Sequence, residues 1–467
     1  MSGYAKTGYE NDNEFWCSSP RLAYIRDMAR ARRAAPWAVL LGVLTRVAVV
    51  TPPNVVTPAF VGSRPGCLNY FVAVVGKSSD GKGLAAGVAA RLIPDLLEAV
   101  TTLPVSGEGL PTMFAAREQI GGGDEGRPST VLKCVNCRAF LDVPEVSVLG
   151  AAMGRSGSTL LGTLTSIWSG ESLGGQNVNE NRRIRAVGLG YRVGLLTGVQ
   201  PGNADMLTRE DVTGLPQRVI WATTHDTEAP DECPSPPAGT FGFDAARLKR
   251  LEPSPLQLTT LYQSGDYWKN ADENHRPLYP LHYLTYPKCV ETEIDADALA
   301  RLHGTRPAGM DGHALFATVK TAGLLAILEQ RDDMLTVSED DWRRAKYIIA
   351  RSREFREECV RSGRETRRGK QRDAYADEYI ANAEAQEMAE REKRERDYHR
   401  WAKRIENALT KYDEGHKGLA GYEIKRRTGL RADETYPTIE RMSAEGRLDK
   451  VGPEADRATL QRWALPV

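Results

Sequence analysis

One short stretch of the sequence combines glycine, serine and lysine residues in a pattern that could bind phosphate. Residues 76–83 read Gly-Lys-Ser-Ser-Asp-Gly-Lys-Gly, and the apolar run 70–75, rich in valine, precedes them. A glycine-bracketed loop after a buried strand presents backbone N–H groups to phosphate oxygens, and its lysine bridges the β- and γ-phosphates. A glycine-rich turn with no ligand is the alternative. We predict that ATP is bound by Gly76, Ser78, Ser79, Asp80, Gly81, Lys82 and Gly83, with Lys82 catalytic.

The loop departs from the usual phosphate-binding pattern at Gly83, where a serine or threonine hydroxyl would hold Mg²⁺. The metal must then be held by water, by Ser78 or Ser79, or by an acid elsewhere. Asp142 ends the apolar run 139–141 and is predicted to bind Mg²⁺ through water. The alternative is an ordinary aspartate at a turn.

Two carboxylates are candidates for the base that polarises the attacking water. Glu108 lies in a Ser-Gly-Glu-Gly turn after the strand-like run 100–105, and Glu145 lies just beyond Asp142. A catalytic base must lie within hydrogen-bond reach of the water that it activates. We favour Glu108, with Glu145 as the second catalytic candidate; either could be a solvated carboxylate.

Two polar residues after later apolar runs complete the predicted site. Gln200 ends the run 193–200 and is expected to contact the γ-phosphate, unless it is only a polar strand end. Arg218 is predicted to act as an arginine finger in a neighbouring subunit, where it would stabilise transition-state charge. An ordinary surface arginine is the alternative. Arg155, in a Gly/Ser loop, could contact DNA or the next subunit.

The elements that must position these residues alternate between strands and helices. Helices are predicted at 20–33 and 36–50, and a helix at 83–100 should kink or restart at Pro94. Strands are expected in the short apolar runs 111–115, 139–141, 191–199 and 217–223. Such alternation predicts an α/β fold with a mainly parallel sheet, whose ligands lie at the carboxyl ends of the strands.

The chain changes character after this region. Residues 310–363 are expected to be helical, with a capping box at Ser338 and Asp341. Residues 364–400 are almost uninterrupted charge, which favours a solvated helical spacer, with a coiled coil as the alternative.

From Trp401, three short helices and a hairpin predict a winged helix-turn-helix domain. A winged helix that binds protein is the alternative to one that binds DNA. The predicted DNA contacts are basic residues of its second and third helices and the turn between them: Lys425, Arg426, Arg427, Arg431 and Arg441.

Composition limits the remaining possibilities. The chain of 467 residues carries 62 basic and 62 acidic side chains, so any DNA contact must come from a local patch. Seven cysteines without framework spacing favour a reducing cytoplasm, and Cys134 and Cys137 lack the second pair that zinc requires. The run 36–50 is too short to span a membrane. Five domains are expected: an N-terminal helical segment (1–65), an ATPase core (66–265), a helical extension (266–363), a spacer (364–400) and a winged helix (401–467).

Several motifs occur in an order that resembles the RecA-like P-loop replication ATPases of actinobacterial phages, prophages and integrative elements, which are similar to the helicase part of primase-helicases. The resemblance covers about residues 20–360. It rests on the glycine loop, Ser106-Gly-Glu-Gly, Leu141-Asp-Val-Pro-Glu, Arg155-Ser-Gly-Ser-Thr, Gly214-Leu-Pro-Gln-Arg and Asp311-Gly-His-Ala with Lys320.

The resemblance implies a RecA-like core and a DNA-dependent ATPase that acts in replication of a mobile element, as a helicase or helicase loader. It also implies a homo-oligomer, such as a hexameric ring. A Gly-Lys-Gly ending recurs in this group. The residues before the loop are too few for a priming module, so a separate primase or other replication proteins are expected partners. Two rival functions remain: a nucleotide-switched DNA-binding initiator or transcriptional regulator, and an interaction protein with an inactive loop.

Overall fold

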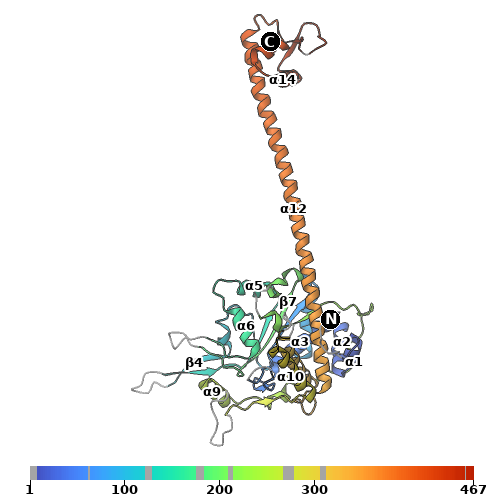
Figure 1. The fold of residues 1–467 in the computed structure, drawn as a ribbon, viewed down its shortest axis with the longest axis vertical. Coiled ribbons are helices and arrows are strands. Elements are labelled where there is room, and N and C mark those ends of the chain that lie inside the picture. The colour runs from blue at the N-terminus through green and yellow to red at the C-terminus, as the bar shows by residue number, and fades with distance from the viewer. Residues whose placement is uncertain are drawn as a thin grey trace. The chain divides into compact units, whose positions relative to one another are not determined.

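The computed structural model describes residues 8–60, 64–120, 129–174, 184–208, 214–266, 278–305, 312–457 and 459–467. Asp311, which belongs to one of the motifs above, lies outside these residues. The chain divides into two compact units, Met1–Arg367 and Arg368–Val467. Unit 1 is a mixed α/β structure around a parallel sheet (Figure 1).

The central sheet of unit 1 has five strands, each parallel to its neighbours. Their order is β3 (Val100–Thr102), β6 (Arg138–Val143), β7 (Arg192–Val199), β2 (Tyr70–Val75) and β8 (Val219–Thr223). The near-continuous apolar sequences of β2 and β7 suit strands that are buried on both faces. Because all five strands run in one direction, their carboxyl ends form a single edge.

Helices cover this sheet and share its core. α3 (Pro36–Val50) is apolar around almost its whole circumference and packs on β2 and β7 and on α4 (Lys82–Leu92). α11 (Ala314–Glu329) is also buried along most of its length. α1 (Asp12–Cys17) and α2 (Pro20–Ala31) complete the N-terminal helices. Residues expected to form a separate N-terminal segment therefore contribute to the same core as the sheet.

Two elements differ from the sequence-based expectation. α4 ends at Leu92 rather than near residue 100, because Ile93 leaves the helical region just before Pro94. The run 111–115 forms the 3₁₀ turn η1 (Leu110–Met113), not a strand of the central sheet. It leads into an antiparallel pair, β4 (Ala115–Ile120) and β5 (Ser129–Cys134), outside that sheet.

The remaining elements of unit 1 are short. β1 pairs in parallel with β9. The bounds are β1 (Val55–Val56), β9 (His282–Tyr283), α5 (Val146–Met153), α6 (Leu160–Ser169), η3 (Pro201–Asn203), α7 (Asp205–Thr208), η4 (Pro216–Arg218), α8 (Ala246–Lys249), α9 (Pro255–Ser264) and α10 (Lys288–Leu302).

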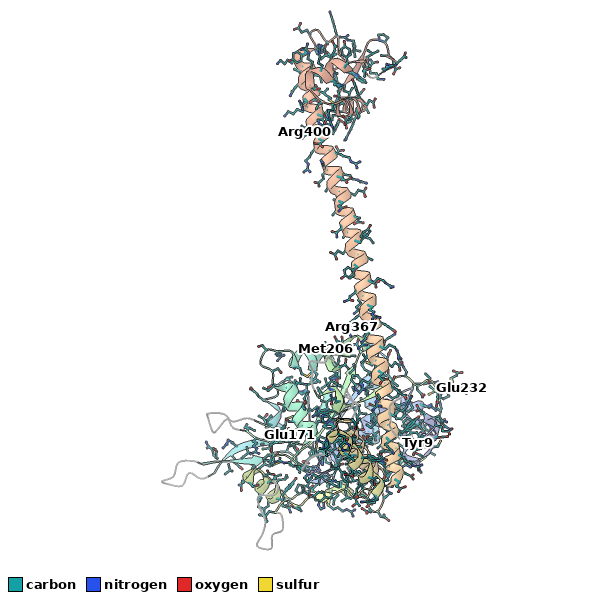
Figure 2. The ribbon with its side chains drawn as sticks, viewed as in Figure 1. Tyr9, Glu171, Met206, Glu232, Arg367 and Arg400 are labelled. Atoms are coloured by element: carbon teal, nitrogen blue, oxygen red, sulfur yellow. The ribbon has the colours of Figure 1, made fainter. Side chains whose placement is uncertain are left out.

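One long helix, α12 (Glu339–Tyr412), replaces the three predicted segments between 338 and 410. It begins at the predicted capping box: the Asp341 N–H donates to the Ser338 Oγ at 3.1 Å, and the Ser338 N–H donates to the Asp341 carboxylate at 2.9 Å. Residues 370–396 are all exposed, and Figure 2 shows their side chains between the Arg367 and Arg400 labels. Ion pairs one turn apart, such as Glu387 with Arg391 at 2.6 Å, support this solvated stretch.

Unit 2 contains the C-terminal part of α12, then α13 (Gly421–Thr428) and α14 (Ala432–Ala444). Three short antiparallel strands follow the order β10 (Leu419–Ala420), β12 (Arg462–Ala464) and β11 (Asp449–Val451). The unit has its own hydrophobic core, which includes Ile405, Ile424, Ile439, Met442 and Trp463. In the described part of the chain, no helix combines the length and apolar character needed to cross a bilayer.

Candidate functional site

The glycine loop, residues 76–83, connects the carboxyl end of β2 to the amino end of α4. Its start is tied to the sheet, since the Gly76 N–H donates to the Val199 carbonyl at 3.0 Å. Ser79 and Gly81 have left-handed φ angles of 68° and 84°, which turn the chain sharply into α4. N–H groups in the first turn of a helix lack intrahelical acceptors, so this end of α4 can bind an anion.

Lys82 folds back across this loop. Its Nζ donates to the carbonyls of Gly76 and Lys77 at 2.7 and 2.8 Å and lies 4.0 Å from an Oε of Glu145. Gly198 on β7 leaves space for the aliphatic part of the Lys82 side chain. A Cβ at this position would lie only 3.1 Å from the Lys82 Cε. The ammonium group is therefore held at the loop by two backbone carbonyls.

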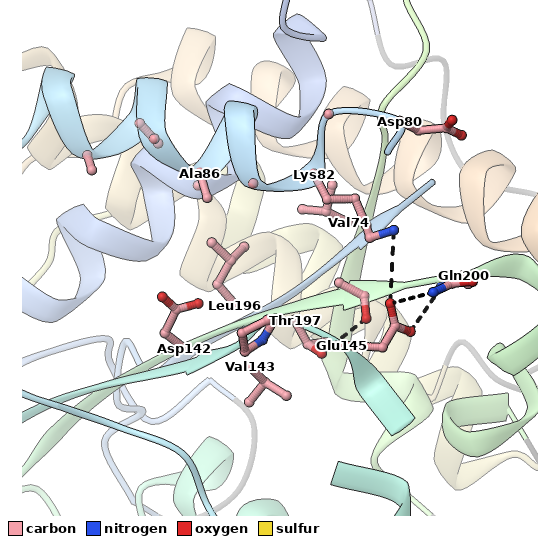
Figure 3. A pocket seen from close by; sticks show the side chains of 18 of the residues that line it. Val74, Asp80, Lys82, Ala86, Asp142, Val143, Glu145, Leu196, Thr197 and Gln200 are labelled. Atoms are coloured by element: carbon pink, nitrogen blue, oxygen red, sulfur yellow. Dashed lines mark hydrogen bonds and ion pairs between the residues drawn. The ribbon is translucent and has the colours of Figure 1, made fainter. Parts of the chain in front are cut away.

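Glu145 and Gln200 meet Lys82 from two neighbouring strands. Glu145 follows β6 and Gln200 follows β7. The Gln200 side-chain amide donates to Glu145 at 3.2 Å, and the Gln200 N–H donates to its other oxygen at 3.4 Å. Figure 3 shows the three side chains joined by these contacts. A cation, a carboxylate and an amide thus converge beside the glycine loop.

Asp142 lies farther back along its strand. In the sheet register Asp142 is opposite Leu196, and Leu196 is opposite Val72, three residues before β2 ends. Glu145, three residues after Asp142, is the acid that reaches the level of the loop. Figure 3 shows Asp142 apart from the contacts around Lys82. Partial burial raises the pKa of Asp142, and the nearby Arg46 guanidinium opposes that rise.

A cavity of about 740 Å³ lies over this edge of the sheet. Residues 78–83 of the glycine loop, which include Lys82, line it together with Asp142, Glu145 and Gln200. Its volume lies within the range of roughly 300–1,000 Å³ that is typical of small-molecule sites. The cavity brings together most of the residues that the sequence assigned to nucleotide and metal.

Gly83 lines the same cavity, and a Cβ built there would meet no other atom within 4 Å. Packing therefore does not require glycine at this position. Within the described ranges there is no group of three or more His, Cys, Asp or Glu side chains that could hold a metal by themselves. The structure fits a Mg²⁺ ion that is held mainly by phosphate oxygens and water with one nearby carboxylate, which is common for this ion.

Glu108 is not among the residues that line the cavity. It is exposed in the turn after β3, and the adjacent Gly107 packs against Thr159 and Thr163 of the α6 region. Arg155 is also exposed, in the loop between α5 and α6.

Arg218 lies at the amino end of β8, which is the opposite edge of the sheet from the glycine loop. Its guanidinium donates to the Gly214 carbonyl at 2.6 Å and stands 5.3 Å from the centre of the Trp168 ring. Burial lowers its pKa. The geometry separates Arg218 from Lys82 of its own chain.

Sequence reasoning assigned no role to two residues that the fold places in notable positions. His225, after β8, lies 3.6 Å from the carboxylate of Asp80 in the glycine loop. Its only sequence signal is a polar residue just after an apolar strand. Lys320 is fully buried, where its Nζ donates to the Asn69 carbonyl at 3.1 Å and lies 3.8 Å from the Trp168 ring centre.

The Cys134 and Cys137 thiols are both partly buried. Burial raises the pKa of Cys134 to about 12 and also raises the pKa of Cys137. This disfavours the thiolate form, which nucleophilic attack needs.

In unit 2 the predicted DNA-binding residues fall into two sets. Lys425, Arg426 and Arg427 are exposed on α13. Arg431, at the start of α14, pairs with Asp433 and Glu434 at 3.3 and 3.4 Å. Arg441 on α14 pairs with Glu395 at 2.8 Å and with Glu445 at 2.9 Å. Carboxylates of the same chain therefore neutralise the α14 set.

No family model matches the chain, and no curated protein matches it. Among solved structures, it is similar to a chain described as "SCCmec type IV Cch - active helicase", at 10% sequence identity and a TM-score of 0.20. The alignment covers 91% of this chain and 67% of that one. A likeness at this TM-score supports no conclusion about the fold or the function of this chain.

Proposed function

We propose that this chain is an ATP-hydrolysing, DNA-associated replication motor, a helicase or helicase loader of a phage or prophage, with a RecA-like P-loop core. The observation that carries the proposal is the convergence of the glycine loop, Lys82, Glu145 and Gln200 at the carboxyl edge of a parallel sheet. Such an arrangement offers amide donors, a cation and a carboxylate to a triphosphate.

The proposed roles follow from position. The loop amides and Lys82 bind the β- and γ-phosphates, and Gln200 holds Glu145 in place while reaching toward the γ-phosphate. Glu145, the carboxylate closest to Lys82, orients the attacking water and accepts its proton. Asp142 lines the same cavity farther back, so we assign it a contact with Mg²⁺ through water. When bound, Mg²⁺ supplies positive charge that offsets the charge on the phosphates.

Two further roles require partners. Arg218, on the opposite edge of the sheet from the loop, is proposed to complete the nucleotide site of a neighbouring subunit in a homo-oligomer, after release from Gly214. Unit 2 is proposed to be a winged-helix domain that binds DNA phosphates through the α13 set. Separate primase or replication proteins complete the proposed system.

The test is the rate of ATP hydrolysis with no DNA, single-stranded DNA and duplex DNA, for the natural chain and for Lys82→Ala. We expect Lys82→Ala to lower turnover at least about 100-fold, because it removes the main charge at the transferred phosphate. Lys288→Ala, a change to an exposed lysine on α10, is the matched control and should keep full activity. Unchanged turnover in Lys82→Ala would contradict the proposal.

Duplex unwinding separates the motor from the regulator. Strand separation that depends on ATP supports the motor. Tight, site-specific duplex binding with little hydrolysis, altered by nucleotide alone, would favour the initiator or transcriptional regulator. Absence of nucleotide binding with or without Mg²⁺ would indicate an inactive loop.

A further inference from the structure

A second cavity, of about 380 Å³, lies next to the glycine loop on the side of β8. Its walls come from the α1 region, the start of α3, the residues after β8, and α12. A small hollow of about 60 Å³ lies between them by its lining: Gly76, Lys77 and Asp80 of the loop line it. Thr223, His225, Phe355 and Glu358 line both the hollow and the second cavity. The second cavity is thus the neighbour of the phosphate loop across His225.

The aromatic side of this cavity is rigid. Trp37 packs against both Tyr347 and Phe355, with ring centres 6.1 and 5.9 Å apart. Asp12 fixes two of them, because it accepts hydrogen bonds from the Trp37 Nε1 at 2.8 Å and from the Tyr347 hydroxyl at 2.7 Å. Arg351 pairs with the same carboxylate at 3.1 Å. These rings are themselves buried, at 5 to 7% exposure, so they form a fixed apolar wall of the cavity and present only small parts of their surface to it.

The polar side of the cavity is rich in acceptors. Asp226 pairs with Arg30 at 2.7 Å, and Glu228 lies 3.6 Å from the same guanidinium. Glu228 and Glu358 are both exposed, so their side chains can turn toward a ligand. Carboxylates accept hydrogen bonds and repel phosphate. Carboxylates therefore suit the hydrogen-bond donors of a nucleoside, namely the ribose hydroxyls and the exocyclic amine of a purine. The glycine loop beside this site instead offers N–H donors and a lysine, which suit phosphate.

We propose that this cavity binds the nucleoside half of the nucleotide, an amino-bearing purine ribonucleoside whose triphosphate lies on the glycine loop. The inference rests on the proposed function, because it needs phosphates at residues 76–83. The purine contacts the Trp37, Tyr347 and Phe355 cluster, and Glu358 accepts a hydrogen bond from the ribose or the amine. His225, beside Asp80, links the two halves of the ligand site.

The inner part of the larger cavity is a less suitable place for the nucleoside. Arg46 there donates to the Ile93 carbonyl at 2.6 Å and lies 5.6 Å from the Phe140 ring centre, beneath α4. That region extends along α4 toward Ala90, away from the helix start where phosphates bind. The second cavity instead lies on the other side of the loop, reached past Asp80.

The test compares ATP with inorganic tripolyphosphate, which carries the phosphates without the nucleoside. Calorimetric titrations use the full chain with Mg²⁺, as the natural protein, Glu358→Ala and Glu357→Ala. Glu357 is the adjacent exposed glutamate on α12 and does not line the cavity. We expect Glu358→Ala to weaken ATP binding about tenfold, the cost of a hydrogen bond to a charged group. Tripolyphosphate binding should not weaken in Glu358→Ala, because a carboxylate repels phosphate, and Glu357→Ala should bind both ligands as the natural chain does.

The outcomes separate this inference from the proposed function. If the natural chain binds ATP no more tightly than tripolyphosphate, the nucleoside site is overturned while the phosphate loop stands. If neither ligand binds, both proposals fail. Crosslinking with 8-azido-ATP gives a second readout that does not depend on any variant. Labelling of the peptide containing Tyr347 and Phe355 supports the inference, whereas labelling around Arg46 and Phe140 overturns it.

Discussion

Gly83 is the residue at which the glycine loop departs from the usual phosphate-binding pattern, and its surroundings bear on how Mg²⁺ is held. A Cβ at this position would meet nothing within 4 Å, so packing does not require glycine here. The consequence of glycine is that the loop lacks the usual hydroxyl ligand for Mg²⁺. The nearest carboxylate to Lys82 is Glu145. Under the proposed function, metal binding therefore depends on water and one carboxylate rather than on a loop side chain.

Restoring the hydroxyl should strengthen metal binding. For Gly83→Ser we expect the Mg²⁺ concentration that gives half-maximal ATP turnover to fall by about tenfold, a typical effect of gaining one ordered ligand. The measurement is a Mg²⁺ titration of ATP hydrolysis at fixed ATP. Gly162→Ser is the matched control, because a Cβ there also meets nothing within 4 Å, but Gly162 lies on α6 and does not line the cavity. An equal change in both variants would contradict the explanation.

Lys320 gives a prediction that is independent of any ligand. Burial lowers its pKa from the usual 10.5 to about 8. Between these two values the unfolded chain binds a proton that the folded chain does not. The free energy of unfolding contributed by this residue therefore rises with pH from about 8 to about 10.5 and is constant below that window.

The measurement is urea unfolding of the natural chain and Lys320→Met at several pH values. The stability of the natural chain relative to the variant should rise by as much as about 1.4 kcal/mol per pH unit within this window. Taking the difference removes the titration of other groups. A pH-independent difference would show that the pKa of Lys320 is not lowered in the folded chain.

Among the elements of unit 2, the helices α13 and α14 differ in how their basic side chains are paired. The exposed basic side chains of α13 lie near one another, and Arg427 stands 4.4 Å from the Tyr412 ring centre. Arg441 of α14 is held by Glu395 and Glu445 and lies 3.9 Å from the Tyr398 ring centre. The α14 set is therefore paired with carboxylates on the surface of unit 2, while the α13 set is exposed to an anionic partner.

The expected consequence is a difference between two variants. Lys425→Glu combined with Arg426→Glu should weaken DNA binding and lower the salt dependence of binding by about one unit for each phosphate that is no longer neutralised. Arg441→Gln should leave the DNA affinity nearly unchanged but weaken unit 2 against urea. Fluorescence anisotropy at several salt concentrations measures the first effect. A larger fall in affinity for Arg441→Gln would assign the DNA-binding surface to α14 instead.

At the scale of the whole molecule, the chain consists of two units with separate cores. Residues 370–396 of α12, which are all exposed, contribute to neither core. Each unit should therefore remain folded when the chain between them is cut. The proposed nucleotide site lies within unit 1, and the proposed DNA surface lies within unit 2.

A protease site introduced at Ala383 of the full chain tests this division. After cleavage, we expect ATP binding to stay with the N-terminal fragment and duplex binding with the C-terminal fragment, while stimulation of ATP hydrolysis by DNA is reduced. Size-exclusion chromatography followed by binding assays on each fragment measures these properties. Loss of ATP binding on cleavage would show that the two units do not function separately.

The elements around the glycine loop follow from local sequence patterns. The apolar run 70–75, the glycine loop and the helix after it are adjacent in the chain, so local patterns predict them, as they predict the Ser338 capping box. The choice between Glu108 and Glu145 as the catalytic base does not follow from local patterns. It depends on which strand ends lie beside Lys82.

Contacts between residues that are far apart in the sequence follow from the packing of the fold. The pairing of β6 with β7 and of β7 with β2 places Glu145 and Gln200, rather than Glu108, next to Lys82. Likewise, ion pairs with Glu395 and Glu445 neutralise Arg441, although its sequence neighbourhood resembles a basic helix. Strand order, register and such pairings depend on packing between segments far apart in the chain, which local sequence patterns do not specify.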